Sequence, residues 1–407
     1  MKIKSIENEI SAIRGKKVFL RVDFNVPIEK GKIKDDQKIV ASLKTIRFLL
    51  RYNCSLIIAT HLGRPRGKKS KKYSTEVLAS RLGKLLGEKV KTEDSLKLKK
   101  YKNIKFINDC IGDKVEKASE ELKPREILFL ENLRFHPGEE RNNKLFAKKL
   151  ASLADLYINN AFSVCHREHA SVAAIKKYLP CFAGYLIKRE LESLEKINKP
   201  QRPLITVMGG VKVVTKINFI KTLATKSDKL LLGGALANNF LEAHGIKTRK
   251  SLKDKKSIEL AKKILDRFSD KIILPVDVVV TKEIKGKRAM VKNINNLEPG
   301  EKIVDIGPET LRLYSKHIKK AETIIWNGPM GLFENKNFEH GSLFMARVIA
   351  SRSTGTAFGL AGGGETVEIL KRSEMMEHMD WVSTGGGAML SYLSKEKMPG
   401  LKKITSK

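Results

Sequence analysis

Short runs of apolar and β-branched residues alternate along this chain with longer segments whose apolar residues recur at helical spacing. In the first half, the short runs lie at residues 18–20, 56–58, 104–107, 127–130 and 156–158. Between the first two runs, apolar residues recur at helical spacing from Ile39 to Leu50. After the second run, a further helix is expected at residues 75–86. Strands without a polar face, separated by helices, are typical of a parallel sheet that helices cover on both sides.

The same alternation stops near residue 180 and starts again after residue 200. The later short runs lie at residues 204–208, 230–232, 272–274 and 323–326. Two such series predict an α/β protein with two doubly wound, Rossmann-like domains, each built on a parallel sheet. We place the first domain at residues 1–185 and the second at residues 186–394.

A strongly charged helical segment lies between the two series, at residues 188–196, and Pro200 and Pro203 bring it to an end. Such a segment is either a connector between two cores or an ordinary surface helix. We take it as the hinge helix that joins the two domains.

The composition is that of a globular protein. With 407 residues and 41% hydrophobic residues, the chain is longer than one ordinary core requires and too apolar to be disordered. The charged N-terminus lacks the apolar core of a signal peptide, and no stretch approaches the roughly 18 apolar residues of a membrane helix. The four cysteines lack the spacing of zinc or redox sites. These features predict a reduced, cytoplasmic protein with no membrane partner.

The formal net charge of +35 is the one extreme value. It fits either a nucleic-acid-binding protein or a surface on which lysine is the default polar residue. The lysines are spread over the whole chain, and the local cluster at residues 68–72 has no interleaved aromatic residue. We therefore favour the surface explanation and expect no nucleic-acid partner.

Basic side chains follow the strands of the first half. In open parallel sheets, ligands bind beyond the carboxyl ends of the strands. The polar residues expected at these ends are Arg21, Asp23, Asn25, His61, Arg64, Arg134, Arg167 and His169. Four different strand ends present an arginine, whose planar fork matches phosphate and carboxylate oxygens. Together they predict a pocket for a small polyanion.

Glycine pairs and triplets follow the strands of the second half, at residues 209–210, 233–234, 362–364 and 385–387, and residues 327–331 add an Asn-Gly-Pro-Met-Gly loop. Glycine lets backbone N–H groups approach a phosphate, and the next helix adds its N-terminal dipole. Neither a P-loop nor a G-x-G-x-x-G fingerprint is present. The pattern predicts a phosphate-bearing ligand over this sheet's edge.

Taken together, these motifs resemble the phosphoglycerate kinase family over essentially the whole chain. The motifs on the acid side are Arg21-Val22-Asp23-Phe24-Asn25, His61-Leu62-Gly63-Arg64-Pro65, Glu131-Asn132-Leu133-Arg134 and His166-Arg167. Those on the nucleotide side are Gly209-Gly210-Val211-Lys212, Trp326-Asn327-Gly328-Pro329 and Ser383-Thr384-Gly385-Gly386-Gly387.

The resemblance implies a role for each matching position. The residues that would hold 3-phosphoglycerate are Arg21, Asp23, Asn25, Lys38, His61, Arg64, Arg134, Arg167 and His169. Those that would hold the nucleotide are Gly210, Lys212, Lys216, Gly233, Gly234, Asn327, Pro329, Glu334, Gly362, Gly363, Gly364, Glu365 and Thr366. Lys38, Lys212 and Gly386 would act on the transferring group, and Glu365 would face the Mg²⁺ of MgATP or MgADP. The C-terminal tail, about residues 395–407, would pack back on the first domain.

This chain also departs from the family pattern. Lys38 stands where the family usually has arginine, and lysine keeps the charge but loses the bidentate fork. Glu365 stands in place of an aspartate, which moves the carboxylate one methylene outward. Asn160 and Ser163 occupy positions where aspartate and glycine are common, and Val211 one where a smaller residue is usual.

The implied reaction is the glycolytic one, a reversible in-line phosphoryl transfer between 1,3-bisphosphoglycerate and MgADP, carried out by a monomer whose domains close on the substrates. The accepting oxygen is already ionised at neutral pH, so no general base is required. Two alternatives remain. A nicotinamide dehydrogenase would need a dinucleotide fingerprint that is absent, and a nucleic-acid-binding protein on a kinase scaffold has only the net charge in its favour.

Overall fold

Two parallel sheets organise the chain, as predicted for the fold class. The computed structural model describes residues 2–87, 90–91, 104–211, 213–286 and 288–406. The chain divides into unit 1, which consists of Met1–Glu192 and Lys397–Lys407, and unit 2, which is Ser193–Glu396. Among the described residues, no helix combines the length and the apolar character that crossing a membrane requires.

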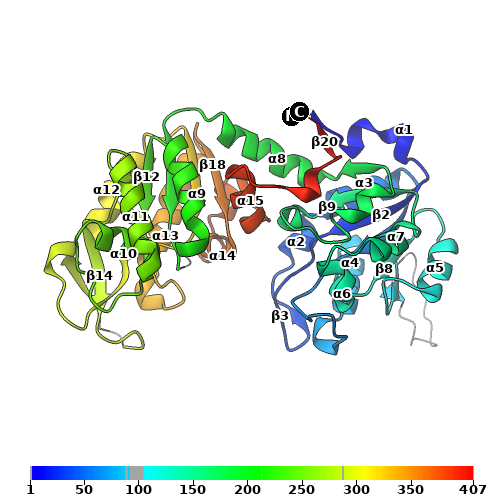
Figure 1. Ribbon diagram of the computed structural model, residues 1–407, viewed down its shortest axis with the longest axis horizontal. Helices are drawn as coiled ribbons and strands as arrows, with labels where there is room; N and C mark the ends of the chain where they lie inside the picture. The colour runs from blue at the N-terminus through cyan, green and yellow to red at the C-terminus, as the bar shows by residue number, and fades with distance from the viewer. Residues whose placement is uncertain (1, 88–89, 92–103, 212, 287, 407) are drawn as a thin grey trace. The chain divides into compact units, whose positions relative to one another are not determined.

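The large sheet of unit 1 is parallel throughout, with the strand order β10-β9-β2-β5-β8-β7-β6 (Figure 1). Its strands are β2 (Lys17–Val22), β5 (Ser55–Ala59), β6 (Val90–Lys91), β7 (Ile104–Ile107), β8 (Ile127–Leu130), β9 (Leu156–Asn160) and β10 (Cys181–Ala183). The helices of this unit are α1 (Ile10–Ile13), α2 (Gln37–Val40), α3 (Leu43–Arg51), α4 (Glu76–Leu86), α5 (Asp113–Glu120), α6 (Pro137–Glu140) and α7 (Lys144–Ala151). A short hairpin joins β3 (Ile28–Glu29) to β4 (Lys32–Ile33).

The apolar runs became strands because both faces of the sheet are covered. Every residue of β5 and β8 is buried. From one side, α3 contributes Ile46 and Leu49, which are fully buried in the same core as Val18. Burying a side chain of this kind contributes about 1.5–3 kcal/mol. In the strand order, β2 lies beside β9. From β2 the chain continues to β5 on one side, and from β9 it continues to β10 on the other side, so the two strands flank a topological switch point. Ligands of open parallel sheets bind at such a point.

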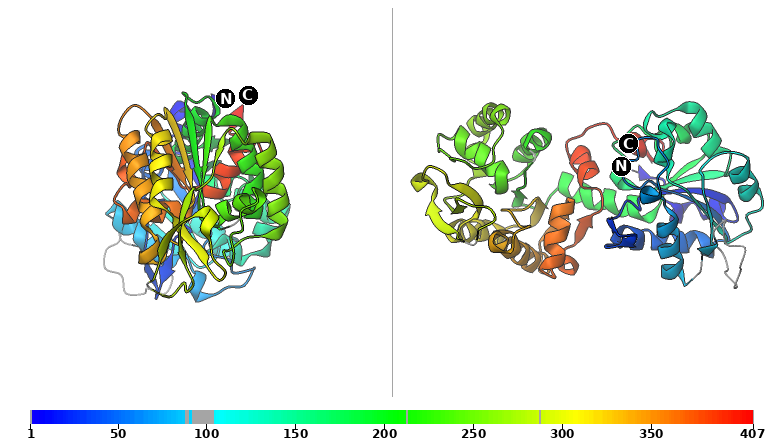
Figure 2. Two further views of the ribbon diagram at one scale, coloured as in Figure 1. Left: turned by 90° about the vertical axis from the view of Figure 1, so that its left-hand side faces the viewer. Right: turned by 90° about the horizontal axis from the view of Figure 1, so that it is seen from below.

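The large sheet of unit 2 is also parallel, with the order β13-β12-β11-β17-β18-β19. Its strands are β11 (Leu204–Met208), β12 (Lys229–Leu232), β13 (Ile272–Ile273), β17 (Thr323–Asn327), β18 (Phe358–Gly362) and β19 (Trp381–Ser383). One face carries α9 (Val213–Lys226), α10 (Gly234–Ala243) and α11 (Lys255–Phe268), and the other carries α12 (Pro308–Ile318), α13 (His340–Ser353) and α14 (Gly364–Arg372) (Figure 2, left). The last helix is α15 (Gly386–Leu393).

A small antiparallel sheet of unit 2 was not predicted. It consists of β14 (Asp277–Thr281), β15 (Met290–Asn293) and β16 (Lys302–Ile306), with β14 in the middle. The carboxylate of Asp277 accepts hydrogen bonds from the backbone N–H groups of Glu309 and Thr310 and so caps the start of α12. This sheet extends the edge of unit 2 without altering the parallel core.

Both chain ends belong to unit 1, where β1 (Lys2–Ile3) pairs antiparallel with β20 (Thr405–Ser406). The buried Lys176 Nζ donates to the carbonyl oxygens of Pro399 and Lys402, at 2.5 and 2.7 Å. Asn159 Nδ2 donates to Gly400 O at 3.1 Å. These contacts fasten residues 397–406 to unit 1. Helix α8 (Tyr185–Asn198) carries the chain from unit 1 into unit 2, with the division after Glu192.

Candidate functional site

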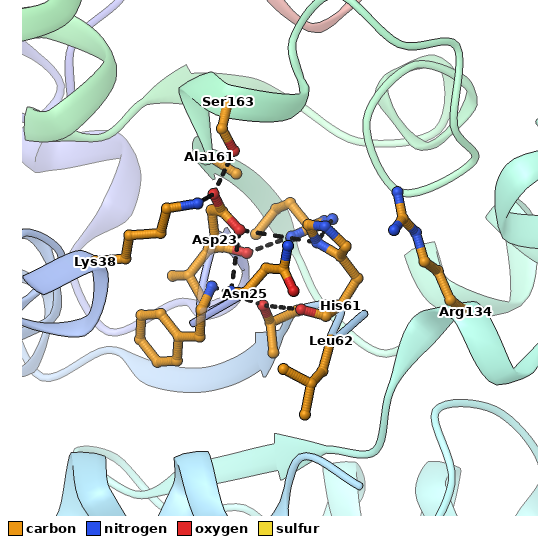
Figure 3. Close-up of polar contacts among 12 residues, drawn as sticks. Asp23, Asn25, Lys38, His61, Leu62, Arg134, Ala161 and Ser163 are labelled. Carbon is orange, nitrogen blue, oxygen red and sulfur yellow. Dashed lines mark hydrogen bonds and ion pairs between the residues drawn. The ribbon is translucent and has the colours of Figure 1, made fainter. Parts of the chain in front are cut away.

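The carboxyl ends of β2, β5, β8 and β9 meet at one edge of the unit 1 sheet, because these strands are parallel neighbours. Val22 lies opposite Asn160 and Arg21 opposite Ala59 in the strand register. The segments that follow the strands therefore bring Asp23, His61, Arg134 and Ser163 to a common edge (Figure 3). The sequence placed the first three at strand ends but identified Ser163 only as a departure from the family pattern.

Asp23 lies at the centre of this edge and is 4% exposed. Its Oδ2 accepts a hydrogen bond from Lys38 Nζ at 2.7 Å and another from Ser163 Oγ. Its Oδ1 accepts from the backbone N–H of Asn25 at 3.1 Å. Burial by itself would raise the pKa of Asp23, but the charge of Lys38 and the hydrogen bonds from Lys38 and Ser163 outweigh it, so this pKa lies well below its usual range.

Arg21 supports the edge from inside the sheet rather than from its surface. Its side chain is fully buried, with Nε donating to Ser171 Oγ at 2.9 Å and Nη2 lying 3.2 Å from His61 Nδ1. An arginine can only donate, so His61 Nδ1 is the acceptor and the imidazole proton is on Nε2. Burial lowers the pKa of His61 well below its usual range, and the nearby cations Arg21, Arg134 and Lys38 act in the same direction. His61 is therefore a neutral donor through Nε2.

Arg134 carries buried donors without acceptors. Its Nη1 donates to Gly63 O at 2.7 Å, whereas the buried Nε and Nη2 make no hydrogen bond within the described part of the chain. Nε lies 3.2 Å from Glu140 Oε1, but the angles are not those of a hydrogen bond. Burial lowers the pKa of Arg134 to about 10, and Arg167 and Arg21 contribute to this shift. Buried donors of this kind call for an anionic acceptor.

His169 and Arg167 lie in the same basic neighbourhood. Burial and the charges of Arg134, Arg21 and Arg167 lower the pKa of His169 to about 3, so this imidazole is neutral at physiological pH. Its buried Nδ1 lacks a hydrogen bond within the described residues. The Nε of Arg167 lies 3.3 Å from His166 Nε2. Several cations acting on one imidazole produce a strongly positive local field, which favours a multiply charged anion.

The remaining acid-side positions are arranged differently. Asn25 Oδ1 accepts from the backbone N–H of Gly63 at 2.9 Å, which joins the β2 and β5 ends. Arg64 is exposed beside them. Glu139, which the sequence analysis missed, is fully buried. Its carboxylate accepts hydrogen bonds from the backbone N–H and the hydroxyl of Ser171, and the same hydroxyl oxygen accepts a hydrogen bond from Arg21 Nε. The sequence carries no signal for this link except the position of Glu139 in the first turn of a helix.

The glycine loops of unit 2 also converge on one sheet edge. A Cβ on Gly209 would clash with Pro329 O, and one on Gly234, whose φ is +61°, would lie 2.7 Å from Gly210 N. These loops therefore pack backbone against backbone, which larger residues would prevent. Their N–H groups hold the loops together: those of Gly209 and Gly210 donate to Asn327 O and Pro329 O, and those of Gly233 and Gly234 donate to Met208 O and Met330 O.

A second group of glycine-side residues surrounds Asn327, whose Nδ2 donates to Gly362 O at 2.6 Å. The buried Thr366 Oγ1 accepts from Gly328 N at 2.7 Å, linking the β17 end to α14. A Cβ on Gly386 would lie 3.0 Å from Gly363 Cα, so the N-terminus of α15 meets the same edge. Gly363 and Gly364 open α14, where backbone N–H groups and the helix dipole favour phosphate.

The charged nucleotide-side positions are two exposed carboxylates and two lysines. Glu365 is exposed in the first turn of α14, and Glu334 is exposed in the loop after Phe333. Lys216 lies on α9. The predicted catalytic residue Lys212 lies outside the described residues. A solvent-accessible carboxylate at Glu365 is the hard oxygen ligand that Mg²⁺ prefers.

Asp109, Cys110 and His136 form a separate cluster whose ligand-type atoms all lie within 4.8 Å of one another. His136 Nε2 lies 2.6 Å from Asp109 Oδ1, and Lys69 Nζ lies 2.9 Å from Asp109 Oδ2. Burial raises the pKa of the Cys110 thiol well above its usual range. The carboxylate already has two partners and the sulfur is protonated, so we assign this cluster a structural role.

Comparisons with known proteins agree along almost the whole chain. The family model described as phosphoglycerate kinase matches residues 8–396. The phosphoglycerate kinase of Moorella thermoacetica is 41% identical over 400 residues, which cover 97% of this chain and 98% of that protein. That of Desulforudis audaxviator is 42% identical over 395 residues, 96% of each chain.

Solved structures give the same result. The phosphoglycerate kinase from Coxiella burnetii matches with a TM-score of 0.83 and 35% identity, covering 99% of both chains. The enzyme from Pyrococcus horikoshii OT3 matches with a TM-score of 0.84 and 32% identity, covering 98% of both chains.

Proposed function

This chain belongs to the phosphoglycerate kinase family, and from that premise we propose how its residues transfer a phosphoryl group between the carboxyl group of 3-phosphoglycerate and the terminal phosphate of a nucleotide. The family makes it a phosphotransferase with ATP or ADP as the nucleotide substrate. Nothing in the fold or the comparisons favours a dehydrogenase or a nucleic-acid-binding protein.

The acid binds at the edge of the unit 1 sheet. The observation that carries this assignment is that the buried Nε and Nη2 of Arg134 make no hydrogen bond within the described residues, with Arg167, His169 and Arg21 close by. A phosphate at this position supplies the missing acceptors and neutralises the local charge. We assign the hydroxyl and carboxyl end of the acid to Asp23, Asn25, Lys38 and His61, because these side chains join the same edge.

The nucleotide binds at the glycine edge of unit 2. The N-terminus of α14 at Gly363 and Gly364 would hold its phosphates, and the closely packed loops at residues 209–210 and 233–234, with Asn327, Pro329 and Thr366, would shape the edge around it. Lys212 and Lys216 would add positive charge, and Glu334 would bind the ribose. Mg²⁺ would enter as part of the nucleotide substrate, with Glu365 as its protein-side oxygen, and would neutralise charge on the phosphates.

The chemistry requires alignment and charge neutralisation rather than proton transfer. The carboxylate that attacks in the ATP-consuming direction is already ionised. Lys38 Nζ donates one N–H to Asp23 and has two more to offer the transferring group. The protein's part is then to hold the two oxygens in line and to exclude water, which would hydrolyse an acyl-phosphate.

A coupled assay tests this function. Purified protein with 3-phosphoglycerate and MgATP should produce an acyl-phosphate that glyceraldehyde-3-phosphate dehydrogenase reduces with NADH. The same preparation should bind duplex DNA weakly and with a steep salt dependence, as expected of a generally basic surface. Tight, salt-resistant DNA binding without turnover would contradict the proposal.

Lys38 provides the matching variant test. Lys38→Ala should lower kcat about 10²-fold or more, the loss expected for one aimed charge in a dry site, with little change in KM for ATP. Lys38→Arg should retain at least the wild-type kcat, because it restores a charged donor. Near-normal turnover of Lys38→Ala would remove this residue from the catalytic machinery.

A further inference from the structure

The carboxylate of Asp23 binds two side chains from different elements at one oxygen. Figure 3 shows Lys38 and Ser163 both pointing at Asp23, one from α2 and the other from the segment after β9. The Lys38 Nζ–Oδ2 distance is 2.7 Å. On the other oxygen, Oδ1, the backbone N–H of Asn25 donates at 3.1 Å.

The sheet topology brings Ser163 to this carboxylate. Ser163 is the middle residue of a 3₁₀ turn, Phe162–Val164, that directly follows β9. Because β9 lies parallel to β2, with Asn160 opposite Val22, the residues that follow the two strands leave the sheet side by side. The hydroxyl therefore reaches an aspartate 140 positions away along the chain.

The hydroxyl must donate in this contact. The low pKa of Asp23 keeps its side chain ionised over the working pH range, and an ionised carboxylate can only accept. Ser163 thus fixes Oδ2 while the Asn25 N–H fixes Oδ1, and the plane of the carboxylate can no longer turn about its last torsion.

Lys38 depends on that fixed carboxylate. Its ammonium stands at the end of a flexible four-carbon side chain that is 31% exposed. Within the described residues, Asp23 Oδ2 is the one hydrogen-bond acceptor of Lys38 Nζ. If the carboxylate turned, the ammonium would lose its position.

We propose that Ser163 is a positioning residue: by fixing the carboxylate of Asp23, it holds the Lys38 ammonium in place for the transferring phosphoryl group. This inference rests on the proposed function, in which Lys38 acts on that group. It adds a residue whose role runs through its hydrogen bond to Asp23.

A double-mutant cycle between Ser163→Ala and Lys38→Ala separates this role from a structural one. In the wild-type background, Ser163→Ala should lower kcat about tenfold and leave KM for ATP within about twofold, a loss in the range for one hydrogen bond to a charged group. In the Lys38→Ala background, Ser163→Ala should change kcat less than about twofold, because the ammonium that Ser163 positions is absent. Ser163→Thr, which keeps a hydroxyl, should recover most of the lost rate.

The matched control is Ser152→Ala. Ser152 is an exposed serine of unit 1 that donates to Lys149 O. The Ser152→Ala substitution should leave kcat and the thermal unfolding midpoint unchanged. An equal loss from Ser163→Ala in both backgrounds, or no loss in the wild-type background, would overturn the inference.

A readout without turnover keeps this test apart from the proposed function. In the ligand-free protein, nitrogen-15 NMR should resolve the Lys38 ammonium with slow hydrogen exchange, and Ser163→Ala should speed that exchange about tenfold or more. If the wild type has no kinase activity, the proposed function fails, yet this measurement still decides whether Ser163 orders Lys38. Unchanged exchange in Ser163→Ala would overturn the inference even in an active enzyme.

Discussion

At the scale of single residues, the site owes its character to side chains whose partners are incomplete. The Nε and Nη2 of Arg134 and the Nδ1 of His169 are buried without hydrogen bonds among the described residues. Such groups cost stability unless a ligand satisfies them. By contrast, a buried series of hydrogen bonds links Arg21 to Ser171 and Ser171 to Glu139. This series supports the site from within unit 1.

Arg167 gives the clearest residue-scale prediction for substrate binding. Arg167→Ala should raise KM for 3-phosphoglycerate about 10–100-fold, because one charged hydrogen bond is worth about 1.5–3 kcal/mol, while KM for ATP stays within about twofold. The exposed Arg141, changed to alanine, is the matched control and should alter neither constant. Equal effects on both substrates would show that Arg167 does not belong to the acid site.

Asp23 gives a pH-dependent prediction. Its folded-state pKa lies below the unfolded value, so its stabilising contribution is present above about pH 4 and is lost as the pH falls toward the folded pKa. Asp23→Asn should therefore lower the thermal unfolding midpoint most at pH 7, and the gap to the wild type should narrow by pH 3. Scanning calorimetry at both pH values measures this gap, and a gap independent of pH would contradict the assigned ionisation.

At the scale of elements, the sequence predicted the core strands and two of the helices, since the segments at residues 75–86 and 188–196 match α4 and lie within α8. The apolar runs at residues 18–20, 56–58 and 204–208 lie within β2, β5 and β11, because strands covered on both faces are apolar throughout. The segment from Ile39 to Leu50 is two helices, α2 and α3. The break lies at Ala41 and Ser42, and the Ser42 hydroxyl donates back to Lys38 O, a bond that competes with helix continuation.

The small sheet β14-β15-β16 was missed, and only β15 lacks a local sequence pattern. Three of the four residues of β15 are exposed, so it has no apolar periodicity, and it is held by backbone pairing with β14. β14 and β16, in contrast, carry β-branched residues typical of strands, at residues 278–280 and 303–304, which the sequence analysis did not use.

The C-terminal tail provides the element-scale prediction. Lys176→Met removes both hydrogen bonds to the carbonyls of Pro399 and Lys402 and leaves those oxygens with fewer donors. Amides of residues 397–406 should then exchange hydrogen at least about tenfold faster, since the loss of a buried hydrogen bond costs about 1–3 kcal/mol. Lys177→Met, at an exposed neighbouring lysine, should leave exchange unchanged. Equal exchange in the two variants would mean that the β1–β20 pairing and the Asn159 contact secure the tail without Lys176.

At the scale of the whole molecule, the chemistry was easier to predict than the contacts. The arginines after four strands of unit 1 and the glycines after the strands of unit 2 could be assigned to ligand sites from the sequence, because parallel strands end at a common edge of their sheet. The contact of Ser163 with Asp23 could not be predicted, because it depends on the register of β9 against β2 and on the direction of two side chains. Lys212, the predicted partner of the phosphoryl group, lies outside the described residues.

The net charge of +35 bears on association rather than on the reaction. In the set of cations around Arg134, burial and unmet donors accompany the charge. This distinction separates a substrate site from a generally basic surface.

The central claim is that the phosphoryl group passes directly between the carboxyl oxygen of the acid and the nucleotide. Phosphorus-31 NMR of the full-length protein with 3-phosphoglycerate, MgATP and hydrazine, which removes the acyl-phosphate, measures this transfer without a coupling enzyme. ATP should be converted to ADP only when 3-phosphoglycerate is present, with one acyl group trapped for each ADP formed, and Lys38→Ala should slow both together. ADP formation without trapped acyl product, or at the same rate without the acid, would contradict the account.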